Sequence, residues 1–181
     1  MKQGVPPGEI LAITFTNKAA REMKDRIMHF VEADEVVREQ TARGGLPFIS
    51  TFHALGVFIL KEYGHHMGLQ KYFTIFDKND VKRAIKEALT LANYDPKQFD
   101  PAKVQSTISR AKGEGITVSQ YEEITTNNYF ENVVLAVWKK YEGLLAKEHA
   151  LDFDDLLLKT VVLLEKYPDV LTACQQRFRY L

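Results

Sequence analysis

Two strand-to-helix junctions constrain the fold of this chain more than any other feature of its sequence. Each consists of a short apolar run, a Thr-Phe pair, a polar capping residue and an amphipathic helix, and they occupy residues 13–20 and 49–54. They lie about one βαβ unit apart, so both Thr-Phe pairs should emerge side by side at the carboxyl edge of a parallel sheet, where open α/β sheets bind ligands. A hydroxyl, an exposed ring and a helix N-terminus at that edge suit a ligand with phosphates and bases.

The apolar pattern predicts a helix-rich α/β chain whose first part, residues 1–63, contains two strands. The continuous apolar run at 9–15 is typical of a buried parallel strand, and Thr16 or Asn17 should cap the helix after it. A polar loop through Gly44-Gly45 should lead to a second strand at 46–50, after which Thr51 caps a helix.

The second part, residues 64–149, is predicted to contain helices alone. Apolar residues recur with a helical period at 77–93, 101–113 and 128–148, and such facing stripes indicate a compact helical subdomain. The last part, residues 150–181, should return to the first part through a helix capped by Asp152, a break at Pro168, a final helix and the start of a strand near Tyr180.

Composition excludes several classes of protein. The 24 basic and 24 acidic residues give zero net charge, so any affinity for nucleic acid must be local. A single cysteine, Cys174, excludes an intrachain disulfide framework and fits a cytoplasmic protein. No apolar run approaches the roughly 20 residues of a membrane-spanning helix, so we expect no membrane partner.

Three segments resemble motifs of superfamily-one DNA helicases of the UvrD/Rep type. They are LAITFTNKAAREMKDRI at 11–27, ISTFHALG at 49–56 and LDFDDLLL at 151–158. Their order and rough spacing agree with that family, and the resemblance covers essentially the whole chain. It implies that the strands belong to a partial RecA-like parallel sheet, a fragment of the P-loop NTPase fold. It also implies that residues 64–149 are an inserted all-α subdomain that contacts duplex DNA.

The resemblance further implies an ATP-dependent motor that moves 3′ to 5′ on single-stranded DNA, meets a duplex junction, and serves DNA repair or replication. ATP and Mg²⁺ would be the cofactors of the parent protein. However, no G-x-x-x-x-G-K-[ST] phosphate loop occurs in the sequence. In the family that loop lies upstream of the first junction, and the Asp-Glu magnesium motif lies downstream of the last segment. We therefore expect an internal, inactive piece of the first motor domain, with no catalytic, cofactor-binding or metal-binding residue of its own.

Several residues are candidates for DNA contact within this resemblance. Phe15 is expected to be exposed and to stack on a base, whereas Phe52, from the second motif, is expected to pack inside. Lys112, in a Lys-Gly-Glu-Gly turn, resembles a phosphate-contacting loop of the family's helical subdomain, with a glycine helix stop as the alternative. The other candidates, which ordinary capping or surface roles would also explain, are Thr16, Asn17, Lys18, Thr51 and His53.

Alternatives remain open at the level of sequence. Asp152, Asp154 and Asp155 could form a metal site, but their clustering on one helical turn is explained more simply by capping. The chain could also belong to a helicase–nuclease, or be a binding module without a motor. A phosphate loop upstream and an Asp-Glu strand downstream in the reading frame would identify the motor.

Overall fold

The structure, a computed structural model, describes residues 5–126 and 128–181 and divides the chain into two compact units. We call Met1–Phe58 with Leu164–Leu181 the strand unit and Ile59–Leu163 the helical unit. From the sequence, the helical part is predicted at 64–149. The structural division therefore groups most of the first helix after residue 150 with the helical unit, and leaves the last helix with the strands.

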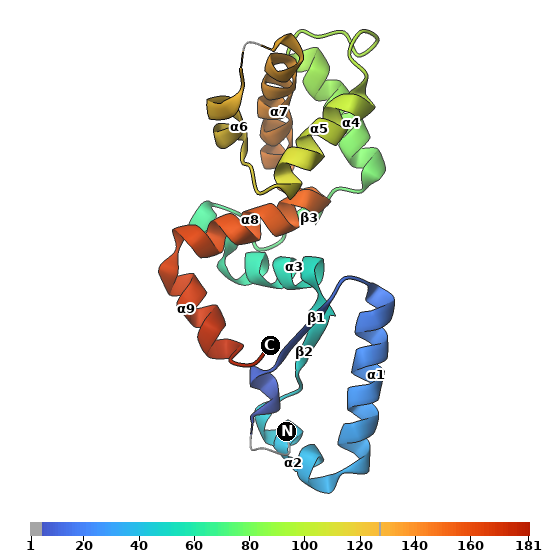
Figure 1. Cartoon of the computed structure of the whole chain (residues 1–181), viewed down its shortest axis with the longest axis vertical. Helices are drawn as coiled ribbons and strands as arrows, with labels where there is room; N and C mark the ends of the chain where they lie inside the picture. Colours follow the sequence, from blue (N-terminus) through green and yellow to red (C-terminus); the bar gives the residue numbers. More distant parts are fainter. Residues whose placement is uncertain (1–4, 127) are drawn as a thin grey trace. The chain divides into compact units, whose positions relative to one another are not determined.

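A pair of short parallel strands organises the strand unit. β1 (Leu11–Thr14) lies beside β2 (Phe48–Thr51), with Thr14 opposite Thr51, and α1 (Asn17–Ala33) returns alongside them (Figure 1). This confirms the predicted parallel pair and its connecting helix, with β1 shorter than the predicted 9–15 and β2 at 48–51 rather than 46–50. Tyr180 forms an isolated parallel bridge with Ile10, the residue before β1.

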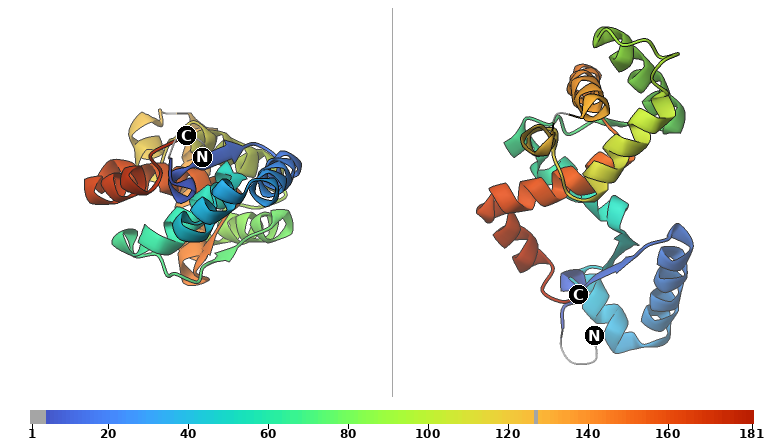
Figure 2. Two further views of the ribbon diagram at one scale, coloured as in Figure 1. Left: turned by 90° about the horizontal axis from the view of Figure 1, so that it is seen from below. Right: turned by 45° about the horizontal axis from the view of Figure 1, so that its top comes forward.

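The connection between α1 and β2 was predicted as a polar loop, and that prediction is wrong. Residues Glu35–Gly44 form helix α2, which lies against α1 and the short 3-10 helix η1 (Pro7–Glu9) (Figure 2). The Asp34 carboxylate caps α2 by accepting the N–H groups of Val36 and Val37 at 3.1 and 3.3 Å. Val37 is buried and anchors this helix despite its polar composition.

Aromatic packing holds the last helix in the strand unit. The ring centroid of Phe48 lies 5.1 Å from that of Phe58 and 5.6 Å from that of Phe178, which follows helix α9 (Pro168–Arg177). The Arg177 guanidinium lies 4.6 Å from the Phe58 ring centroid. The predicted final helix, which begins at Pro168, is therefore confirmed and is fixed by side chains of β2 and α3 (Phe52–Tyr63).

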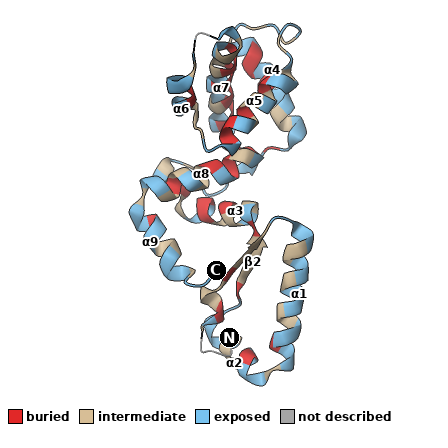
Figure 3. Cartoon of the chain, in the orientation of Figure 1, coloured by how far each residue is buried: buried red, intermediate tan, exposed pale blue. Residues whose placement is uncertain are grey.

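The helical unit is built around one buried helix, α7 (Tyr129–Lys147), as the concentration of buried residues in Figure 3 shows. Val133, Val137 and Trp138 on α7 are completely buried, and α4, α5 and α6 all pack against this helix. The other elements of the unit, apart from the part of α3 that continues into it, are η2 (Gly64–Met67), β3 (Thr74–Ile75), α4 (Lys78–Leu91), α5 (Pro101–Gly113), α6 (Val118–Ile124), β4 (Ala150–Leu151) and most of α8 (Phe153–Lys166).

The three helices predicted for this part, α4, α5 and α7, are confirmed to within about two residues at each end. Helix α6 was missed because it is only seven residues long; a capping box between Thr117 and Gln120 starts it. The two-residue parallel pair of β3 and β4 was also missed. Among the described residues, no helix has the length and apolar character needed to cross a membrane.

Candidate nucleic-acid interface and the Lys112 cluster

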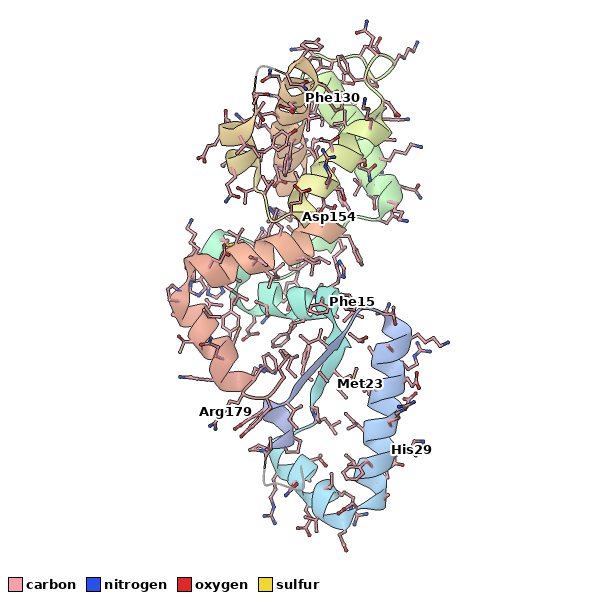
Figure 4. All side chains as sticks on the ribbon, in the orientation of Figure 1. Phe15, Met23, His29, Phe130, Asp154 and Arg179 are labelled. Atoms are coloured by element: carbon pink, nitrogen blue, oxygen red, sulfur yellow. The ribbon has the colours of Figure 1, made fainter. Side chains whose placement is uncertain are left out.

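The two strand-to-helix junctions lie at the same edge of the strand pair. Because Thr14 and Thr51 are paired in register, the residues that follow them, Phe15 and Phe52, leave the sheet side by side. Their ring centroids are 5.1 Å apart with planes tilted by 39°. Phe15 is 88% exposed and stands at the start of the turn into α1 (Figure 4). The predicted juxtaposition of the junctions and the predicted exposure of Phe15 are both confirmed.

The expected burial of Phe52 is wrong. Its side chain is 39% exposed, because it is the first residue of α3 and packs on the ring of Phe15 at the sheet edge. Two neighbouring aromatic rings therefore share one solvent-facing edge of the strand unit. Such rings offer apolar faces on which a nucleobase can stack.

The N-terminus of α1 lies directly beside these rings. Thr16 caps the helix: its hydroxyl oxygen accepts the N–H of Ala19 at 3.1 Å. Thr16, Asn17 and Lys18 are all exposed, and the first turn contains no acidic residue. The first N–H groups of a helix have no intrahelical acceptor, and they carry the positive end of the helix dipole. An anionic group can therefore approach this end beside the Lys18 side chain.

The second junction offers less to a ligand. Thr51 is 8% exposed, and its hydroxyl oxygen already accepts the N–H of Ala54 at 3.3 Å as the cap of α3. The capping prediction is confirmed, but burial argues against a direct phosphate contact by this side chain. His53 is partly exposed, and remains a candidate for a polar contact at the edge of the site.

Lys112 does not lie where DNA could reach it, so the phosphate contact predicted for it is corrected. Its side chain, in the last turn of α5, is completely buried. Its Nζ lies 2.8 Å from both Asp152 Oδ2 and Asp155 Oδ1, and 3.2 Å from a carboxylate oxygen of Glu142. A buried ammonium that three carboxylates surround is unavailable to a phosphate.

A compact polar network surrounds this lysine, and we call it the Lys112 cluster. The Tyr141 hydroxyl donates to Asp152 Oδ2 at 2.9 Å, and Lys159 Nζ donates to Glu142 Oε2 at 3.1 Å. The cluster consists of Lys112, Tyr141, Glu142, Asp152, Asp155 and Lys159. Tyr141, Glu142 and Lys159 were not predicted from the sequence as members of such a network; the i,i+4 spacing of Asp155 and Lys159 was the available signal.

The charges of the Lys112 cluster do not balance, and the pKa values reflect this. Burial alone would lower the pKa of Lys112, but its neighbouring carboxylates raise it, led by Asp155. Burial would raise the pKa of Glu142, but Lys112 and Lys159 lower it to about 2. Three acids face two bases, so burial, aided by the neighbouring acids, raises the pKa of Asp155 to about 6.

The acidic turn at the start of α8 therefore has a structural explanation. Asp152 Oδ1 accepts the N–H of Asp155 at 2.8 Å, so the predicted capping is confirmed. Both carboxylates also bind Lys112. Within residues 5–126 and 128–181, no group of three or more His, Cys, Asp or Glu side chains is arranged to hold a metal ion. The observed partners thus favour capping and ion pairing over the metal-site alternative.

Comparison with known proteins identifies the family of this chain. Residues 1–181 match the family model for the UvrD/REP helicase N-terminal domain. The chain is 39% identical over 179 residues to the ATP-dependent DNA helicase PcrA of Bacillus subtilis (strain 168), covering 98% of this chain and 23% of that protein. It is 40% identical over 175 residues to PcrA of Leuconostoc citreum, covering 97% and 22%. It is 38% identical over 181 residues to PcrA of Staphylococcus aureus (strain Mu50 / ATCC 700699), covering 99% and 23%. The chain thus spans less than a quarter of the length of these curated relatives, and it belongs to the UvrD/REP helicase family, within the part that its N-terminal domain describes.

Proposed function

We propose that this chain is part of an ATP-dependent DNA helicase that moves 3′ to 5′ on single-stranded DNA. In this proposal the strand unit supplies a piece of the single-strand track, and the helical unit approaches the duplex junction. Membership of the UvrD/REP family and the PcrA relatives, which are named as ATP-dependent DNA helicases, support the proposal. Because the chain spans 23% of the first of these relatives, the complete activity belongs to a longer protein.

The single observation that carries the DNA-binding role is the exposed ring pair of Phe15 and Phe52. A phenylalanine that is 88% exposed beside a second ring that is 39% exposed forms an apolar surface at the ligand-binding edge of a parallel sheet. Stacking of one base on such a ring contributes roughly 1–3 kcal/mol and tolerates any base. The ring pair therefore suits binding that does not depend on DNA sequence.

The phosphates of the bound strand would meet the N-terminus of α1. The hydroxyl of Thr16, the amide of Asn17 and the ammonium of Lys18 are exposed there, beside the first N–H groups of the helix. Lys18 is the one full charge among them, so few counterions would be released. We therefore expect a shallow dependence of affinity on salt.

ATP and Mg²⁺ are the cofactors that the family implies for the complete protein. The residues present do not fit them: the 181-residue sequence contains no phosphate-binding loop, and the described residues contain no cluster of metal ligands. We therefore assign no step of ATP hydrolysis to the side chains of this chain.

Titration of the 181-residue chain with a short oligo-dT strand, followed by NMR, tests the proposal. Amide shifts are expected at Phe15 and the three residues that follow it. Phe15→Ala should weaken binding by about 5- to 150-fold, the equivalent of one lost stacked base at roughly 1–3 kcal/mol. Its thermal stability should stay unchanged, since the ring is exposed.

Phe30→Ala is the matched control, because this phenylalanine lies on the same helix, far from the junction, and is 41% exposed. It should leave the affinity for oligo-dT unchanged. If Phe15→Ala unfolds the protein while its folded fraction binds DNA normally, the ring is part of the core and the proposed DNA surface is wrong.

A further inference from the structure

The helical unit contains a cavity that the proposed DNA-binding role does not use. Its volume is about 430 Å³, within the range of roughly 300–1,000 Å³ that is usual for small-molecule sites. Residues from α4, α5, α7 and the start of α8 line it. Figure 4 labels Asp154, which lies in the first turn of α8. All of its lining residues belong to the helical unit, so it is independent of the ring pair in the strand unit.

The walls of this cavity are mainly apolar and partly aromatic. Val81 and Ile85 of α4 and Ile108 of α5 supply aliphatic surface. Three aromatic side chains also line it: Phe76 and Tyr141, which are buried, and Phe153, which is 57% exposed. Aromatic faces attract cations through their quadrupole, most strongly where water is excluded.

The charges around the cavity are predominantly negative. Asp77, Asp152 and Asp154 line it, whereas Lys78 is the one basic lining residue. The Asp77 carboxylate is engaged as the cap of α4, and Asp152 accepts from Lys112 and the Tyr141 hydroxyl. Among the residues that the structure describes, Asp154 forms no hydrogen bond or ion pair with its side chain. Asp152 connects the cavity to the Lys112 cluster, in which acids also outnumber bases. With Asp152 counted once, the lining and the network that adjoins it together contain five acids and three bases, which is an excess of negative charge.

This combination selects one class of ligand. A phosphate or carboxylate compound would be repelled by the acids. A neutral apolar compound would remove water from a charged carboxylate and offer no hydrogen bond or opposite charge in return, which is unfavourable. An ammonium group can pair with the Asp154 carboxylate and contact the aromatic side chains, while its apolar part fills the aliphatic region. We propose that this cavity binds an organic cation with an apolar body, such as an alkylated aromatic ammonium compound.

NMR titration of the full chain with benzyltrimethylammonium tests this site, and phenylacetate serves as an anionic probe of similar size. The cation should produce saturable shifts at the lining residues and should bind at least about tenfold more tightly than the anion, a difference of roughly 1.4 kcal/mol. Asp154→Asn should weaken binding of the cation several-fold, since it removes the unpaired carboxylate without altering the core.

A second pair of variants tests whether binding occurs inside the cavity. Ser109→Phe places a ring in it from α5 and should abolish the shifts, whereas Ser106→Phe, at an exposed position of the same helix outside the cavity, should not. Fluorescence of the buried Trp138 reports whether each variant is folded. The proposal is overturned if both probes bind equally, if neither produces saturable shifts, or if Asp154→Asn leaves affinity for the cation unchanged. Should Ser109→Phe fail to fold, Asp154→Asn decides the result by itself.

Discussion

Replacing Lys112 with methionine should destabilise the helical unit strongly. Methionine keeps most of the volume of the side chain but removes the ammonium that three carboxylates share at 2.8–3.2 Å. Lys159 alone would then face Glu142, Asp152 and Asp155. Removing one partner of a buried ion pair typically costs about 3–5 kcal/mol, because the remaining charge is buried without compensation. For a chain of this length, that loss corresponds to a fall in melting temperature of roughly 6–20 °C.

Urea unfolding followed by tryptophan fluorescence measures this effect in the relevant part of the chain. Trp138 is the only tryptophan, is completely buried, and donates its indole N–H to Glu142 at 3.1 Å, so its emission reports on the helical unit. Lys139→Met is the control: it removes an exposed ammonium of α7, the helix that carries Trp138, and the partner of this ammonium, Glu122, is solvent-exposed. A surface pair of this kind contributes at most about 1 kcal/mol.

The loss of stability caused by Lys112→Met should also be smaller at acidic pH. In the wild-type chain Lys112 is the main cause of the low pKa of Glu142, about 2, so removing it lets the carboxylates accept protons at higher pH. Protonation of these acids removes the uncompensated charge. If Lys112→Met unfolds at the same urea concentration as the wild type but binds oligo-dT more weakly, Lys112 is a surface phosphate contact and the description of the buried cluster is wrong.

Three further predictions concern pH, a hydrogen bond and nucleotide. The pKa of Asp155 is raised from 3.8 to about 6 in the folded state, so between these values the folded protein binds a proton that the unfolded chain does not. The free energy of unfolding should therefore rise by about 1–3 kcal/mol as pH falls from 7 to 4.5. Urea unfolding of Asp155→Asn should lack this pH dependence. Tyr141→Phe removes the 2.9 Å hydrogen bond to Asp152 and should cost about 1.5–3 kcal/mol in the same assay. Calorimetric titration of the chain with Mg-ATP should show no micromolar binding, and such binding would contradict the view that the nucleotide site lies outside it.

The sequence predicted the strand-to-helix junctions well because they depend on neighbouring residues. An apolar run followed by a capping hydroxyl defines both the end of a strand and the start of a helix within a few positions. The same pattern placed Phe15 at the edge of the sheet, where its ring is indeed exposed. The exposure of Phe52 could not be predicted in this way, because it depends on how its ring meets Phe15, 37 positions earlier.

The Lys112 cluster shows the limit of local reasoning more clearly. Lys112 precedes a glycine in a charged turn, a context that is typical of the surface, and its partners lie 40 and 43 residues further along the chain. Only the packing of α5 against the start of α8 brings an otherwise ordinary lysine to the acids that had been interpreted as helix caps. The helix α2 was missed for a related reason, since one buried side chain, Val37, anchors a segment that is otherwise polar.

Because Lys112 is buried, the DNA-binding proposal rests on the strand unit alone. With Lys112 buried in the helical unit and Thr51 covered, the proposed contacts gather at one place, the edge formed by Phe15, Phe52 and the N-terminus of α1 in the strand unit. Stability and DNA binding should therefore separate in the variants. Lys112→Met should reduce the folded fraction in urea while each folded molecule binds oligo-dT as before, and Phe15→Ala should do the opposite. If a variant at either position changed both the stability in urea and the affinity of the folded protein for oligo-dT, stability and DNA binding would not be separate properties of the two units.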